Sequence, residues 1–182
     1  MKKNKYFLKI LIISYILFPI KILALGSIDI DNTNLEIIKG NKETVNIKLN
    51  NAAGRIDINT MDSDVVSISD ESIFLDNSQA AITFNGIDVG NTTITIYAYD
   101  VTTYDSESLT GKIYTISASV IDMGDIDKDG KIALNDVIVL IKKYLGIFSI
   151  TADDLLTGDM DKNGIIGIND VILLLKTYIG LD

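Results

Sequence analysis

The segments TTITIYAYD (92–100) and KIYTISASVI (112–121) alternate apolar and polar side chains along the chain. In the second segment Tyr114, Ile116, Ala118 and Val120 form the apolar set. A period of two places one set of side chains on the buried face of a β-strand and the other set in solvent. The two segments therefore predict two half-buried β-strands.

The same alternation continues toward the N-terminus, in short runs separated by Asn, Asp, Gly and Ser. These runs are ETVNIKLN (43–50), RIDIN (55–59), VVSIS (65–69), SIFLD (72–76) and AAITFNG (80–86). Short alternating strands with such turns are typical of an antiparallel β-sandwich. Residues 27–121 are therefore predicted to form an all-β Ig-like sandwich of some seven strands.

Residues 1–26 have the composition of a secretory signal peptide. Four lysines lie in MKKNKYFLK, an apolar run follows with one interruption at Lys21, and Ala24-Leu25-Gly26 ends the segment. A charged start, an apolar middle and a small-residue end define such a peptide. The alternative, an uncleaved membrane anchor, is disfavoured by Lys21 and by the short apolar run. We therefore expect cleavage after Gly26 and a secreted, extracellular protein that meets the membrane only through this peptide.

The charge of the remaining chain is strongly negative. The first 26 residues hold five lysines and no acidic residue, which leaves 11 basic and 25 acidic residues and a net charge of −14. Such a chain repels nucleic acid and anionic lipid, and it favours bound cations. The sequence also has no cysteine and no histidine, so a small extracellular fold would need a stabilising element other than disulfides.

After Asp122 the pattern changes from strands to two copies of a loop followed by a helix. GDIDKDGKIALND (124–136) precedes VIVLIKKYLG, and GDMDKNGIIGIND (158–170) precedes VILLLKTYIG. The copies 124–146 and 158–180 share 14 of 23 residues without a gap, so a duplicated unit is indicated. A short linker helix is predicted in SITADDLL (149–156), and Gly146 and Gly180 are predicted to end the longer helices.

Apolar residues recur with helical spacing in both copies, and this spacing predicts one core-facing stripe on each helix. The stripes comprise Val137, Leu140, Ile141, Tyr144 and Leu145 in the first copy, and Val171, Leu174, Leu175, Tyr178 and Ile179 in the second.

The two loops carry oxygen donors at the spacing of an EF-hand calcium loop. Side chains at positions 1, 3, 5 and 12 would coordinate the ion, glycine at position 6 permits the turn, and position 7 supplies a backbone carbonyl. The predicted ligands are Asp125, Asp127, Asp129, Lys131 and Asp136 in the first loop, and Asp159, Asp161, Asn163, Ile165 and Asp170 in the second. We therefore predict two bound Ca²⁺ ions.

The same loops could be a pair of acidic turns that bind no metal, but two copies in register make this less attractive. Magnesium is disfavoured because the loops offer many protein oxygens, and zinc because the nitrogen and sulfur ligands it prefers are absent. Position 12 is aspartate rather than the usual glutamate, so the closing carboxylate has a shorter reach.

Two family resemblances follow from these motifs. The order of SIDIDNTNLEIIKGNKETVNIKLNNA, DSDVVSIS and GIDVGNTTITIYA resembles the bacterial Ig-like group 2 family, and the duplicated half EF-hand in 124–182 resembles the type I dockerin domain. The resemblances imply a fold of two domains: an all-β Ig-like antiparallel sandwich (27–121) and a small all-α dockerin (122–182). They also imply a cohesin-like module as partner.

The dockerin resemblance assigns partner recognition to loop positions 10 and 11 and to basic residues on the helices. On a helical wheel, some apolar residues also lie opposite the predicted core stripe. The resulting partner-binding set is Leu134, Asn135, Val139, Lys142, Lys143, Ile168, Asn169, Leu173 and Lys176. Incidental surface exposure would account equally well for Val139 and Leu173.

The leading functional hypothesis is a secreted, non-catalytic protein that docks onto a cohesin-bearing scaffold or surface protein, in an assembly for polysaccharide breakdown or surface display. The alternative is a calcium-stabilised adhesion or carbohydrate-binding protein, since Tyr97, Tyr99 and Tyr104 could offer a platform to a cell-surface glycan. A glycosidase needs two carboxylates in a cleft, and the best-organised acids here belong to the metal loops. No catalytic residue is predicted.

Overall fold

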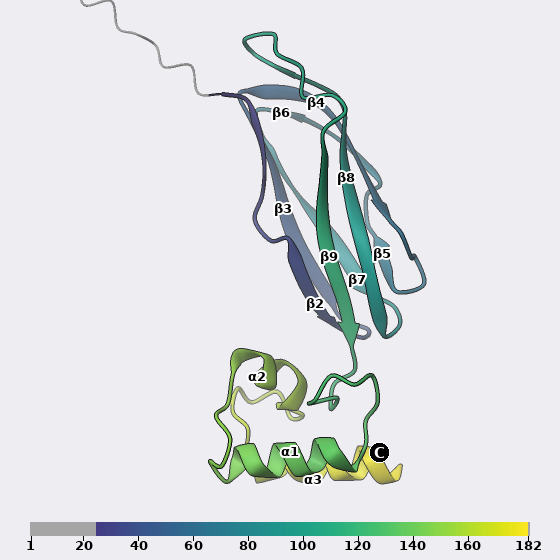
Figure 1. Ribbon diagram of the computed structural model, residues 1–182, viewed down its shortest axis with the longest axis vertical. Coiled ribbons are helices and arrows are strands. Elements are labelled where there is room, and N and C mark those ends of the chain that lie inside the picture. The colour runs from purple at the N-terminus through teal and green to yellow at the C-terminus, as the bar shows by residue number, and fades with distance from the viewer. Residues whose placement is uncertain (1–24, 182) are drawn as a thin grey trace, which may run out of the picture.

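The computed structural model describes residues 25–181, and the predicted signal peptide lies outside this range except for its last two residues. The described chain is mostly β, with a two-layered sandwich and three helices at one end of it (Figure 1). No helix within the described range is long and apolar enough to cross a membrane.

The first layer of the sandwich is a four-stranded sheet in the order β1-β3-β7-β5. Its strands are β1 (Ser27–Ile30), β3 (Lys42–Asn50), β5 (Val66–Ile68) and β7 (Gln79–Gly86). All pairs in it are antiparallel, and Val45 of β3 faces Ile82 of β7. The alternation predicted for 43–50 therefore points Val45, Ile47 and Leu49 into the core.

The second layer is a five-stranded sheet in the order β2-β9-β8-β4-β6. Its strands are β2 (Asn34–Ile38), β4 (Ala52–Thr60), β6 (Ser72–Asp76), β8 (Gly90–Thr103) and β9 (Ile113–Ile121). The pair β2–β9 is parallel and the others are antiparallel, so the predicted antiparallel sandwich carries one parallel edge. A register shift between Arg55 and Ile56 bends β4 against β8.

The core between the sheets consists of aliphatic side chains and one buried phenylalanine, Phe84. Ile94, Ile96 and Ala98 of β8 are fully buried beside Ile116 of β9, as the alternation of the opening segments predicts. Because every second residue of these strands faces this core, the opposite set faces solvent on the outer surface of each sheet.

The three helices lie below the sandwich (Figure 1). They are α1 (Leu134–Tyr144), α2 (Ala152–Gly158) and α3 (Ile168–Ile179). The predicted linker helix is confirmed as α2, which Thr151 caps by accepting a hydrogen bond from the backbone N–H of Asp154. Gly180 ends α3 in the left-handed region at φ 70°, and Gly146 follows α1 at φ 71°, as predicted.

The predicted core-facing stripes are correct for four of their ten residues. Val137 and Leu140 of α1 and Val171 and Leu174 of α3 are buried, with Ile126 and Ile166 from the loops. The remaining stripe residues are exposed: Ile141, Tyr144, Leu145, Leu175, Tyr178 and Ile179. Helical spacing cannot tell which of two adjacent apolar stripes faces a core, because both have the same period.

The predicted fold class, a sandwich followed by a separate all-α dockerin domain, is wrong. The described residues form a mostly-β, sandwich-like chain to which three short helices are attached. The helices enclose only six buried apolar residues, too few for a domain that folds without further support. They are also joined to the sandwich, because Lys128 in the first loop forms an ion pair with Glu36 on β2.

Candidate calcium loops and docking face

The first acidic loop brings three carboxylates together. Oxygens of Asp125, Asp127 and Asp136 lie within 4.8 Å of one another. Asp125 and Asp136 are buried, whereas Asp127 is exposed at the loop surface. Gathered carboxylates repel one another unless a cation lies among them, and oxygen donors at this separation suit a hard divalent ion.

The second loop repeats this arrangement with Asp159, Asp161 and Asp170. The backbone is also repeated, since Lys128 and Lys162 both have φ 58° and Gly130 and Gly164 both have φ 88°. A lysine at positive φ is uncommon, so the same conformation in both copies indicates that the loop shape is specified by its sequence.

The loop carboxylates hold their own loops in shape. Asp125 accepts hydrogen bonds from the backbone N–H groups of Asp129 and Gly130, at 3.1 and 2.9 Å. Asp159 accepts the equivalent bonds from Asn163 and Gly164, at 3.0 and 2.7 Å. Position 1 of each loop therefore organises the turn that contains the glycine.

The aspartate at position 12 links each loop to its helix. One oxygen of Asp136 accepts from the backbone N–H of Ile126 at 2.8 Å, and the other accepts from Ala133, the N-cap of α1, also at 2.8 Å. Asp170 likewise accepts from Asp161 at 3.1 Å and from Gly167, the N-cap of α3, at 2.7 Å. The shorter side chain thus closes the loop and caps the helix at once.

The electrostatics of the first loop disfavour an ionised carboxylate at Asp125 that has no positive charge beside it. Burial raises the pKa of the Asp125 carboxyl, backbone hydrogen bonds from Gly130 and Asp129 lower it, and the negative charge of Asp136 raises it; the net shift of the pKa is upward. An ionised Asp125 is therefore costly in the folded protein by itself, and a divalent cation beside it would remove that cost.

The other predicted ligands are placed less centrally. Asp129 is not part of the gathered group, and it accepts a hydrogen bond from the backbone N–H of Lys131 at 3.0 Å. Asn163 accepts the matching bond from Ile165 at 3.0 Å. The side chains of Lys131 and Ile165 are exposed, so only their backbone carbonyls are candidate ligands.

The predicted partner-binding residues do not form one uniform surface. Leu134, Ile168, Asn169 and Lys176 are exposed, and Leu173 is half-buried. Val139 packs against the small helical core. Asn135 donates a hydrogen bond to the Asp127 carboxylate.

The two remaining residues of the predicted set are lysines of α1. Lys143 is largely enclosed, and it donates to Asp154 of α2 at 2.7 Å. Lys142 is half-buried, with its ammonium 5.3 Å from the centre of the Phe148 ring.

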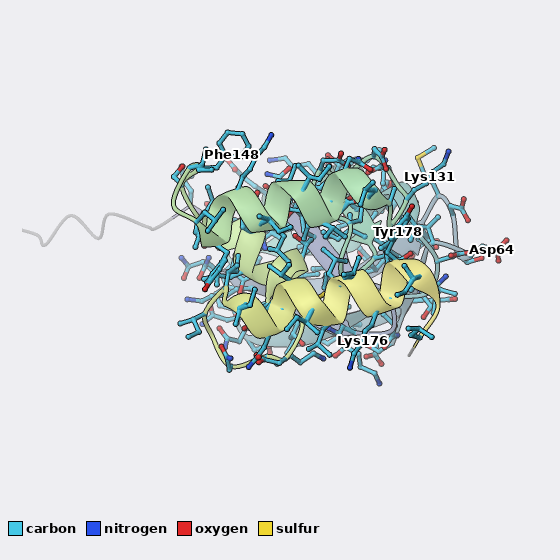
Figure 2. All side chains as sticks on the ribbon, turned by 90° about the horizontal axis from the view of Figure 1, so that it is seen from below. Asp64, Lys131, Phe148, Lys176 and Tyr178 are labelled. Carbon is cyan, nitrogen blue, oxygen red and sulfur yellow. The ribbon has the colours of Figure 1, made fainter. Side chains whose placement is uncertain are left out.

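The helices α1 and α3, at the end of the molecule away from the sandwich, carry a longer series of exposed apolar residues. In Figure 2 the two helices lie side by side as the outermost layer. We call this surface the two-helix face. Its exposed residues recur at i, i+4, i+7 and i+11 in both copies: Leu134, Ile138, Ile141 and Leu145, and Ile168, Ile172, Leu175 and Ile179.

Sequence reasoning missed Ile138 and Ile172 and placed Ile141 and Leu175 in the core. The available signal was the second periodic apolar stripe on helices that have apolar residues on more than one side. Eight exposed large apolar side chains with one spacing exceed the scattered exposure usual on a soluble protein.

No family model and no curated protein matches the sequence. Among solved structures, the chain is similar to domains 4 and 5 of the S-layer protein SbsC, with 25% identity over 53% of this chain and 52% of that one, and a TM-score of 0.40. It is also similar to WR4, an MSP family member of C. elegans, with 13% identity over 52% of this chain and 96% of that one, and a TM-score of 0.39.

A third similarity is to the D0-D1 domain of intimin, with 16% identity over 52% of this chain and 49% of that one, and a TM-score of 0.34. The chain spans about half the length of the SbsC fragment. TM-scores of this size do not establish a common fold or function.

The identification of the chain as a type I dockerin after a bacterial Ig-like group 2 domain is wrong. No family model matches, and the mostly-β chain contains no separate all-α module within residues 25–181. The calcium-loop pattern specifies the residue types at only about a dozen positions, those of the loop itself. It therefore does not specify the family of the surrounding fold.

Proposed function

We propose that this protein is a non-catalytic, extracellular docking protein whose helical end binds two Ca²⁺ ions and a partner protein. One observation carries the proposal: the two-helix face presents eight exposed apolar side chains in two matching rows. The loops that begin the two helices would hold the ions, and the sandwich would serve as the rigid body that is docked.

Calcium has a defined part in this proposal. Asp125, Asp127 and Asp136 would coordinate one ion, and Asp159, Asp161 and Asp170 the other. Because Asp136 and Asp170 also cap α1 and α3, ion binding would stabilise the first turn of each helix. The two-helix face would then be fully formed only in the calcium-loaded protein.

The character of the partner follows from the residues around the two-helix face. Lys176 on α3 and Lys142 on α1 flank the apolar rows, although the chain as a whole is acidic. The face therefore suits a protein with an apolar surface rimmed by acidic side chains. That the partner is a cohesin-like module, and that it attaches this protein to a cell surface, remain predictions.

The test is whether the immobilised, purified protein captures a partner, and whether this capture requires Ca²⁺. Wild type and an Ile138→Asp/Ile172→Asp variant would be immobilised and exposed to the medium and surface extract of the producing cells, with Ca²⁺ or with EDTA. These two positions are preferred to Val139 and Leu173, which are half-buried. Ile87→Asp, at an exposed position of the sandwich, is the matched control.

The proposal requires one protein that binds wild type and the control in Ca²⁺, is released by EDTA, and fails to bind the double variant. A charge buried at the centre of an apolar interface should cost about 2 kcal/mol or more, which is a loss of affinity of roughly thirtyfold or more and should strongly reduce capture. Equal capture by the double variant, or self-association of wild type through this face in sedimentation, would refute the partner claim.

A further inference from the structure

The outer surface of the five-stranded sheet carries a second group of exposed rings, far from the helices. Phe74 of β6 is 72% exposed and Tyr99 of β8 is 50% exposed. Phe74 lies directly opposite Arg55 of β4, whose guanidinium carbon is 3.7 Å from the centre of the Tyr99 ring. These three side chains form a row across three neighbouring strands.

A second row lies beside the first. Ser72, Asp57, Tyr97 and Ile113 face one another in register across β6, β4, β8 and β9. Tyr97 is half-buried, and its ring lies 6.2 Å from the Tyr99 ring in an edge arrangement. We call the two rows together the aromatic sheet face.

The polar groups in the middle of the aromatic sheet face are paired. Arg55 lies 3.2 Å from a carboxylate oxygen of Asp57, and Ser72 donates to the same oxygen at 2.7 Å. The pair of opposite charges cancels, so the centre of the face offers hydrogen-bond donors and an acceptor without net charge.

Folding alone does not require these exposed rings. Aromatic residues do favour strands, but the side chains on the next rows of the same surface are small and polar: Asn59, Thr95 and Thr115. The rings are therefore concentrated at one place on the sheet, although small polar side chains are compatible with the same strands. Exposed rings beside paired polar groups are typical of binding surfaces.

We propose that the aromatic sheet face binds a neutral carbohydrate chain. The apolar faces of sugar rings would stack on Phe74 and Tyr97, and sugar hydroxyls would exchange hydrogen bonds with Arg55 and Asp57. An anionic ligand is disfavoured by the acidic chain and by the neutral centre of the face. Four adjacent strands span about 14 Å, so the face would contact several sugar units in line.

The test is affinity electrophoresis of the calcium-loaded protein in gels that contain one neutral polysaccharide each: hydroxyethylcellulose, xyloglucan, galactomannan or a soluble β-1,3-glucan. A gel with polygalacturonate tests an anionic chain. At least one neutral polysaccharide should retard wild type, and Phe74→Ala/Tyr97→Ala should lower the affinity about tenfold or more.

Controls separate this inference from the docking proposal, on which it does not depend. Tyr144→Ala removes an exposed ring from the helical end and should leave retardation unchanged, and Phe74→Tyr should retain it. Retardation by polygalacturonate alone, by none of the gels, or equally for wild type and Phe74→Ala/Tyr97→Ala would overturn the proposal. Circular dichroism of the double variant checks that it is folded before its affinity is compared.

Discussion

Single residues show how closely each loop is tied to its helix. Asp136 and Asp170 are fully buried, and each accepts hydrogen bonds from the beginning of its loop and from the N-cap of its helix. A glutamate there would place its carboxylate one methylene further away. The aspartate at position 12 thus serves its loop and the first turn of its helix together.

The ion pair between Lys143 and Asp154 predicts a loss of stability in acid. Burial raises the pKa of the Asp154 carboxyl, but hydrogen bonds from Lys143 and Thr151 outweigh it and hold the pKa below the ordinary 3.8. A lowered carboxylate pKa stabilises the fold at pH values above the ordinary one. That contribution is lost as the pH falls below 3.8 toward the lower folded value.

Asp154→Asn should therefore destabilise the helical end by about 1.5–3 kcal/mol at neutral pH, as expected for the loss of a charged hydrogen bond. Urea unfolding followed by far-UV circular dichroism, at constant Ca²⁺ between neutral pH and pH 3, would measure it. The difference between wild type and variant should shrink below pH 3.8. A difference that does not change with pH would contradict the assigned role of Asp154.

At the scale of elements, the strands and the helices depend on different sources of stability. The sandwich strands enclose a large aliphatic core, whereas α1 and α3 bury only six apolar residues with their loops. Isolated helices of 11 and 12 residues are marginal in water. The helices must therefore obtain much of their stability from the loops that begin them.

Removal of calcium should consequently melt α1 and α3 while the sandwich persists. Circular dichroism with and without EDTA should show a loss of the helical signal, with the β signal retained, and a lower first transition on heating. The variant Asp136→Asn/Asp170→Asn should show the reduced helical signal even in Ca²⁺. An unchanged helical signal of wild type in EDTA would refute the coupling of ion binding to helix formation.

Across the whole molecule, the helical end is joined to the sandwich by few contacts. Lys128, between two acidic residues of the first loop, donates to both oxygens of Glu36 on β2, at 2.7 and 2.8 Å, and lies 3.4 Å from Asp153 on α2. A pocket of about 320 Å³ beside it separates the loop from the ends of β8 and β9. Lys128 thus connects three parts of the chain across an open junction.

Lys128→Gln should loosen this junction and cost little stability, about 0.5 kcal/mol, because the pair is partly exposed. Distances between spin labels on β4 and α3 should become more broadly distributed in the variant. Lys162→Gln, at the same place in the second loop, is the matched control and should leave the distribution unchanged. Equal distributions for Lys128→Gln and wild type would show that other contacts orient the helices.

Seven of the nine described strands (β3 to β9), the two acidic loops, the linker helix and the glycine helix ends could be read from the sequence, whereas β1 and β2 were not predicted. Each depends on local spacing, and local spacing is visible in one dimension. The gathering of Asp125, Asp127 and Asp136 follows in the same way from positions in a single loop. Whether these positions bind calcium remains a prediction.

The tertiary structure decided which apolar stripe faces inward, how β2 pairs with β9, and that the helices attach to the sandwich instead of forming a domain of their own. In α1 the buried Val137 and Leu140 and the exposed Ile138 and Ile141 are equally apolar, so composition cannot rank them. Which stripe is buried depends on what it contacts: one stripe packs against α3, and the other meets solvent. Burial depends on such partners, and residues distant in the chain supply them only after it has folded.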